Sequence, residues 1–241
     1  SNVFFSCVDY VKEKRPDLFI LENVTGLLTH DGGRSLEFVT NTLEAIGNGA
    51  YDVVRHVLNT EDFAVPQHRI RVFFVGRRKE IVQGPLPPVK KLPRVSLEEF
   101  LQRISGPETT AAAAAPLCDR SKEVLEARCA SLRAHNIDPA KQCCVVDVDA
   151  SMQYASCMVD RCPCLLAGRT AGYWITNRQR RLRFYELCCL QGFPHLSSKK
   201  VSEGQLTRML GNSITVDVIR EVLRSALNSC SMGASLVLQL P

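Results

Sequence analysis

The sequence predicts an α/β fold, because apolar patterns at helical spacing alternate along the chain with short apolar runs typical of buried strands. The clearest of these runs is Leu18–Val24, which ends in polar residues that include Glu22 and Asn23. We expect a buried parallel strand here. Ligands usually bind where the strands of an open α/β sheet reach their carboxyl ends, so Glu22 and Asn23 mark the first candidate site.

Helical patterns flank this strand in the sequence. The apolar residues before it recur at helical spacing and are Val3, Phe4, Cys7, Val8 and Val11. This first helix must end before Pro16. The apolar face of a second helix, after the strand, comprises Leu36, Phe38, Val39, Leu43 and Ile46. Gly47–Gly49 comes next, and because it follows a helix instead of joining a strand to one, it predicts a helix cap and not a nucleotide-binding loop.

Two more strands are predicted at Tyr51–Asn59 and Arg71–Gly76, and the sequence PQHRIR at residues 66–71 lies at the start of the second one. Alternation along this strand start places Arg69 and Arg71 on one face. Because neighbouring guanidinium groups repel, the pair indicates a shared anion or polar ligand. A basic hairpin in solvent is the alternative.

The composition changes over residues 79–142. Prolines, a short helical run near Ser96–Ile104 and an alanine run at 111–115 indicate a variable insert or linker. Strand character returns at Cys143–Asp149.

A basic cluster follows the aromatic residues Tyr173 and Trp174. Its members are Arg178, Arg180, Arg181 and Arg183. Guanidinium groups beside aromatic rings suit phosphates and stacked bases, and a solvated basic loop is the alternative.

The last part of the chain predicts two helices. The first carries Leu187 and Leu190 on its apolar side and ends at Gly192–Pro194. We expect the second to begin at Leu210–Ile214 and to run as far as Leu227. Its amino end would offer free backbone N–H groups to a carboxylate or another polar ligand.

Composition narrows the class of protein. A chain of 241 residues suffices for one sizeable domain, or for a core with a small lobe. No apolar run is long enough to span a membrane, and the net charge of +5 is compatible with a polyanionic partner. Eleven cysteines, an odd number, without a signal peptide indicate reduced thiols inside a cell. Because the chain begins at Ser1 in a helix that needs a sheet beside it, we expect a piece of a longer protein.

A zinc site is an alternative use of some thiols. The candidate ligands are Cys143, Cys144, Cys157, Cys162 and Cys164. The sequence contains no Cys-x-x-Cys, so we predict core cysteines and no bound metal.

Taken together, these stretches resemble the later half of the DNA cytosine-5 methyltransferases. Phe4-Phe5 with its helix is similar to the family's fifth motif, and Glu22-Asn23-Val24 is similar to the sixth. Pro66–Arg71 is similar to the eighth motif. Glu186 with Leu190–Pro194 is similar to the ninth, and Gly211-Asn212-Ser213 to the tenth. The resemblance implies an α/β fold with a partial Rossmann-like methyltransferase sheet and a small irregular target-recognition lobe. It divides the chain into a catalytic part at 1–78, a recognition region at 79–183 and a return to the catalytic domain at 184–241.

The resemblance also implies the reaction. Such enzymes flip cytosine out of the duplex, attack its C6 with a thiolate and transfer a methyl group from S-adenosylmethionine to C5. The implied catalytic residues are Glu22 at N3 and Arg71 at O2, with Arg69 as the neighbour of Arg71. The implied cofactor-binding residues are Asn212 and Ser213. The candidate DNA-binding residues are Gln67, Tyr173, Trp174, Arg178, Arg180 and Arg181.

Two of the family's motifs are absent from the sequence, namely the glycine-rich Phe-x-Gly-x-Gly and the Pro-Cys-Gln nucleophile loop. Pro163-Cys164 is followed by Leu165 and lies in the recognition region, so we predict that Cys164 is not the nucleophile and that the segment alone is inactive. The alternatives are a non-catalytic DNA-binding or regulatory relative and a transfer-RNA cytosine-5 methyltransferase. We expect double-stranded DNA as the partner, no membrane, and an intracellular location, nuclear in a eukaryote. The oligomeric state stays open.

Overall fold

The computed structural model describes residues 2–104, 116–169, 171–197 and 200–231. The chain forms two compact units. The first unit comprises residues 1–58, 70–91 and 219–241, and the second comprises residues 59–69 and 92–218. These compact units are not the same divisions as the functional regions implied by the resemblance, because residues 59–69 and 184–218 fall in the second unit and residues 79–91 in the first. The expected alanine run at 111–115 lies outside the described residues.

The described part of the first unit contains a sheet with the strand order β1-β4-β2. The strands are β1 (Leu18–Val24), β4 (Ile70–Arg78) and β2 (Tyr51–Asn59). β1 pairs with β4 in the antiparallel direction, so the expected parallel pairing is wrong for this pair. An apolar run indicates burial on both faces and carries no information on strand direction, which is why the pattern misled.

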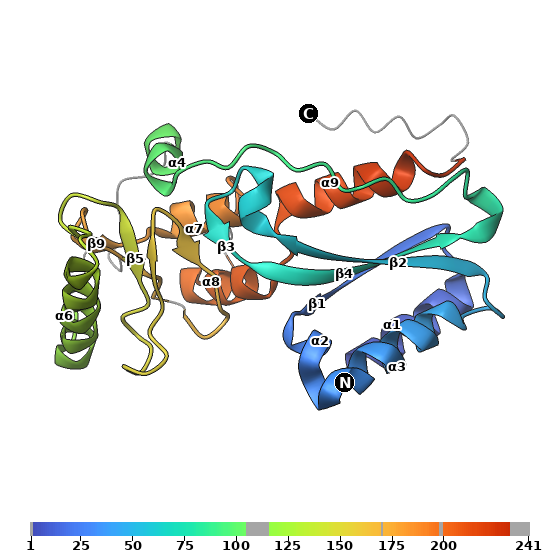
Figure 1. Cartoon of the computed structure of the whole chain (residues 1–241), viewed down its shortest axis with the longest axis horizontal. Helices are drawn as coiled ribbons and strands as arrows, with labels where there is room; N and C mark the ends of the chain where they lie inside the picture. The colour runs from blue at the N-terminus through green and yellow to red at the C-terminus, as the bar shows by residue number, and fades with distance from the viewer. Residues whose placement is uncertain (1, 105–115, 170, 198–199, 232–241) are drawn as a thin grey trace. The chain divides into compact units, whose positions relative to one another are not determined.

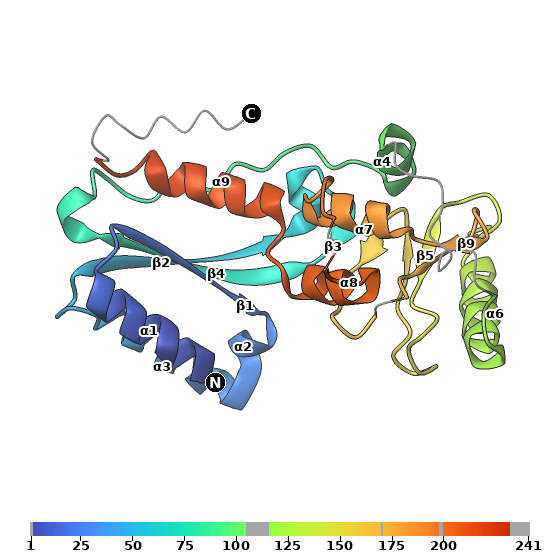
Figure 2. The same cartoon turned by 180° about the vertical axis from the view of Figure 1, so that it is seen from behind.

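Helices cover both faces of this sheet (Figures 1 and 2). α1 (Asn2–Lys14) and α3 (Arg34–Glu44) lie on one face, and α9 (Val216–Leu227) lies on the other. Three short helices join the longer elements, and these are α2 (Gly26–Thr29), η1 (His30–Gly33) and η3 (Lys79–Ile81). The predicted helices before and after β1 are therefore confirmed.

The first unit's core lies between the sheet and the helices α1 and α3. Its buried residues include Val8, Val11, Phe19, Val39, Leu43, Ile46, Tyr51, Val72 and Phe74. The backbone of β4 approaches the Phe19 ring so closely that a Cβ added at Gly76 would lie 2.1 Å from Phe19 Cζ. Arg77 is buried beside this core, where its guanidinium bonds to Asp52 and donates to Ser229 Oγ over 2.6 Å. These contacts fix β4 between β1 and β2.

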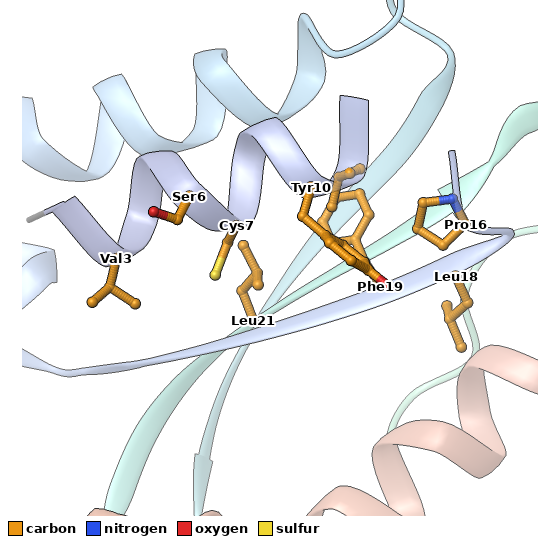
Figure 3. Close-up of a pocket in the computed structure, with 9 residues that line it drawn as sticks. Val3, Ser6, Cys7, Tyr10, Pro16, Leu18, Phe19 and Leu21 are labelled. Atoms are coloured by element: carbon orange, nitrogen blue, oxygen red, sulfur yellow. The ribbon is translucent and has the colours of Figure 1, made fainter. Parts of the chain in front are cut away.

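An apolar groove of about 500 Å³ runs between α1 and β1 (Figure 3). Val3, Cys7 and Tyr10 line it from α1, and Leu18 and Leu21 line it from β1. In the described ranges β4 is the one strand that pairs with β1, so the groove lies beside a sheet edge. Apolar side chains at an open strand edge favour association with other chains.

The described residues of the second unit form short strands and four longer helices. A sheet with the order β6-β5-β8-β9 is built from Cys157–Val159, Cys144–Val146, Trp174–Ile175 and Arg180–Arg181, all antiparallel. β3 (Gln67–His68), which follows η2 (Thr60–Phe63), pairs in parallel with β7 (Cys162–Pro163). The helices are α4 (Leu97–Arg103), α6 (Asp119–Ala134), α7 (Phe184–Gln191) and α8 (Glu203–Asn212).

Two of these helices differ from the expectations. α6 lies in the segment that the composition marked as an insert or linker. We expected one helix to begin at Leu210–Ile214, but this segment contains the break between two helices. α8 ends at Asn212, and α9 begins at Val216. Ser202 starts α8 early, since its hydroxyl accepts from the Gln205 N–H in a capping box. By contrast, the helical run predicted near Ser96–Ile104 is confirmed as α4, and α7 is confirmed with its cap at Gly192.

No helix within the described ranges combines the length and the apolar character that crossing a bilayer requires.

Candidate active site

Glu22 and Arg71 meet at one end of the first unit's sheet. Antiparallel pairing brings the carboxyl end of β1 beside the start of β4, with Val24 opposite Arg71 and Glu22 opposite Phe73. Opposed residues share a face and so do residues two apart, so Glu22 and Arg71 are diagonal neighbours on the same face. Arg71 Nε lies 2.7 Å from Glu22 Oε1, and the two side chains are 15% and 17% exposed respectively.

The contact between them is a pair of charges and not a well-directed hydrogen bond. Glu22 Oε1 is buried, yet in the described part of the chain it has no hydrogen-bond partner, although Arg71 Nε is at ion-pair distance. Distance alone does not make a hydrogen bond, because the N–H must also point at the oxygen. Arg71 Nη1 instead donates to the Ile70 carbonyl over 2.9 Å. Glu22 Oε1 therefore keeps hydrogen-bonding capacity that no residue in the described part of the chain uses.

Arg69 has surroundings unlike those of Arg71. It is 3% exposed, and its guanidinium donates to the carbonyls of Leu165, Gly211 and Ser213 over 3.0, 3.3 and 2.7 Å. Each guanidinium has protein partners of its own, which differs from the side-by-side pair that alternation predicted. The physical reason is local, because β3 ends at His68 and β4 begins at Ile70, so regular alternation does not run through Arg69.

Asn212 and Ser213, the candidate cofactor residues, lie at the carboxyl end of α8 and not at the start of a helix. Asn212 is exposed. The Ser213 hydroxyl donates to the Leu210 carbonyl over 2.8 Å, which leaves its oxygen able to accept. We expected free backbone N–H groups at the start of a helix here. The end of a helix instead presents backbone carbonyls, together with the side chains of Asn212 and Ser213.

Two of the candidate DNA-binding residues are core residues. Gln67 is fully buried and its Nε2 donates to the Leu190 carbonyl over 3.5 Å. Tyr173 is 1% exposed and its hydroxyl donates to the Cys164 carbonyl over 2.7 Å. A buried ring has no face on which a base can stack, so the structure gives both residues a packing role. Trp174 is partly buried in β8.

Three of the four arginines in the predicted cluster form ion pairs within the second unit. Arg178 pairs with Glu98 at 2.7 Å, and Arg181 pairs with Asp149 at 2.7 Å. Arg180 contacts both carboxylate oxygens of Glu186, at 2.7 and 2.8 Å. Glu98 and Asp149 are distant from these arginines in the sequence, and Glu186 lies in the helix that follows them. The sequence alone therefore did not show that these carboxylates neutralise the arginines.

A polar cluster at Glu61 escaped the sequence analysis. Glu61 is 6% exposed and accepts from His68 Nδ1 over 2.5 Å and from Arg161 Nη1 over 2.9 Å. Burial raises the pKa of Glu61, but the hydrogen bond from His68 and the charge of Arg161 outweigh it, so the pKa lies below its usual range. The one sequence feature that could have indicated this cluster is His68, a polar residue inside the PQHRIR motif.

The thiols differ in exposure and in pKa. Burial raises the pKa of Cys143 to about 12 and that of Cys188 to about 12. Cys118 is exposed, and its hydrogen bond with Ser121 lowers its pKa. No group of three potential metal ligands gathers within the described ranges.

Iodoacetamide at about pH 8 should therefore alkylate Cys118 well before Cys143 and Cys188, because the thiolate is the reacting form. Peptide mass mapping over time measures the order, and a Cys118→Ser variant should lose the fast phase. Equally fast labelling of Cys143 would contradict the burial argument.

Two solved structures that align with this chain are methyltransferases. The Entamoeba histolytica methyltransferase EhMeth aligns with a TM-score of 0.59 at 14% identity, over 93% of this chain and 68% of that one. The S. pombe Dnmt2 methyltransferase aligns with a TM-score of 0.51 at 20% identity, over 93% and 70%. The chain therefore has an α/β methyltransferase fold.

A model of the C-5 cytosine-specific DNA methylase family matches residues 1–228, and the chain belongs to this family. It is 33% identical to the Type II methyltransferase M.NgoBI of Neisseria gonorrhoeae over 90% of this chain and 63% of that protein. It is 30% identical to the Type II methyltransferase M.HaeII of Haemophilus aegyptius over 99% and 69%. The family resemblance is thus confirmed, and the chain spans less than two thirds of M.NgoBI.

Proposed function

We propose that this chain is the part of a DNA cytosine-5 methyltransferase that polarises the target base. The observation that carries the proposal is the Glu22–Arg71 pair, with an unsatisfied buried carboxylate oxygen beside a guanidinium. Cytosine presents N3 and O2 as adjacent acceptors on one edge. A carboxyl group and a guanidinium side by side match these two atoms, and the family to which the chain belongs supports this substrate.

The proposed roles follow from the electronics of the ring. C5 of cytosine is a poor nucleophile until a thiolate has added to C6. Glu22 would hold a proton at N3, which draws electron density from the ring, and Arg71 would donate to O2 and stabilise the charge that develops there. Both groups act in a partly buried site, where such interactions are stronger than in water.

S-adenosylmethionine would supply the methyl group in the complete enzyme. Asn212 fits one edge of its pocket, since an exposed amide both donates and accepts, and the Ser213 oxygen can accept beside it. The residues described here form an edge of a cofactor site and not a whole one. We propose that the glycine-rich motif and the nucleophile loop come from the part of the protein that corresponds to the unmatched remainder of M.NgoBI.

Double-stranded DNA is the proposed partner, and the protein would act inside the cell, where DNA is found. The target base must leave the stack to reach Glu22. We propose that residues 79–183 contribute target recognition, with the partly exposed Trp174, Arg178 and Arg180 near the DNA backbone, while residues 1–78 and 184–241 belong to the catalytic domain. Arg181 is buried and pairs with Asp149, so its proposed role is to stabilise this region. Phosphate contacts of this kind weaken as salt rises.

The chain by itself should bind duplex DNA weakly and transfer no methyl group, because Cys164 has no Pro-Cys-Gln context and the sequence lacks the glycine-rich cofactor motif. The measurement is incubation with tritiated S-adenosylmethionine and a cytosine-containing duplex, with Cys164→Ser as the matched variant. Label that disappears in the variant would make Cys164 the nucleophile.

The complete protein decides between the proposal and its alternatives. It should label duplex DNA and leave transfer RNA unlabelled. A complete protein that binds DNA without labelling it would be a regulatory relative, and label in transfer RNA alone would assign the other methyltransferase class.

A further inference from the structure

Arg69 lies in the same motif as Arg71, yet its guanidinium joins three segments of the second unit. It donates to the Leu165 carbonyl beyond β7, and to the Gly211 and Ser213 carbonyls at the end of α8. The backbone of Arg69 is itself fixed, since its N–H donates to Asn59 Oδ1 and its carbonyl accepts from the Thr60 N–H. A rigid backbone thus holds a planar, multi-donor group at this junction.

The acceptors explain why a cation is stable there. The last carbonyls of a helix have no partners within the helix and carry the negative end of its dipole. Arg69 supplies donors and positive charge to the end of α8, and it does so where the guanidinium is almost wholly buried. Loss of the guanidinium would leave buried carbonyls without donors.

A second observation shows how closely the junction is packed. A Cβ added at Gly211 would lie 2.3 Å from Ala167 N and 2.5 Å from the Leu166 carbonyl carbon. These are backbone atoms, which cannot swing away as a side chain can. The position of the Gly211–Ser213 turn is therefore set by the 165–167 backbone on one side and by Arg69 on the other.

We infer that Arg69 is a positioning residue for the turn that carries Asn212 and Ser213 and does not contact the base. Arg69 fixes the turn that presents Asn212 and Ser213. A change at this residue of the PQHRIR motif therefore lowers the affinity for the cofactor without removing a cofactor contact. The cofactor part of this inference rests on the proposed function, whereas the positioning of the turn does not.

The first test uses the 241-residue chain and hydrogen exchange. Arg69→Lys, which keeps the charge but cannot bridge the three carbonyls, should speed exchange at amides 211–215 about tenfold or more. Gly211→Ala should do the same from the other side of the turn. The control is Arg208→Gln, an exposed change on α8 that should leave these amides unaltered. Unchanged exchange at 211–215 in Arg69→Lys, or loss of protection throughout the second unit including α4, would overturn the inference.

The second test separates positioning from base contact in the complete enzyme. Arg69→Lys should raise KM for S-adenosylmethionine about tenfold with kcat changed less than about threefold. A fall in kcat at saturating cofactor with unchanged KM would mean base contact and overturn the inference. If hydrogen exchange responds as expected but the complete protein methylates nothing, the proposed function fails and the positioning of the turn stands.

Discussion

Glu22→Gln in the complete enzyme should lower kcat by ~10² to 10⁴, the range typical of a general acid or base. The amide has nearly the size of the carboxyl group, so β1 and its pairing with β4 should persist. It cannot deliver a carboxyl proton to N3, and it removes the charge that faces Arg71 at 2.7 Å. The measurement is single-turnover methyl transfer at saturating cofactor, together with DNA affinity, which should change little.

Glu37→Gln is the matched control for this variant, because Glu37 is exposed in the first turn of α3 and lies outside the site. Its rate should equal that of the unmodified enzyme. Turnover in Glu22→Gln that also matches the unmodified enzyme would remove Glu22 from the mechanism.

Arg71→Ala should cost roughly 1.5–3 kcal/mol of transition-state stabilisation, the usual worth of a hydrogen bond to a charged group. This corresponds to a rate about 10- to 150-fold lower. The loss has two sources, since the donor to O2 disappears and the buried Glu22 oxygen loses its neighbouring charge. Single-turnover rates and melting temperatures, measured together, separate catalysis from stability.

Arg78→Ala is the control at the other end of β4. Arg78 pairs with Asp17 and is 31% exposed, so its loss should change the rate little. Equal losses in the two variants would show that Arg71 acts only as basic surface. A double variant of Glu22 and Arg71 should lose less than the sum of the single losses, because residues that act as a unit are not additive.

The sequence by itself determined the elements and the family. Periodicity is a local property, so it located α1, α3 and β2, and the turn chemistry of Gly192 marked a helix end that the structure confirms. The order of the motifs pointed to the family that the comparisons establish. Glu22 stood out because a polar group at the end of an apolar strand is unusual in a buried run.

Tertiary structure alone decided which side chains meet. Strand direction and register depend on the packing of the whole core, and the antiparallel β1–β4 register is what places Glu22 beside Arg71. The same holds for burial, since no local pattern reveals that Arg69 faces three carbonyls or that Tyr173 is enclosed. Contacts between segments far apart in the sequence leave no periodic pattern in it. Because these contacts decide whether a side chain lies in the core or in the site, only the tertiary structure shows its role.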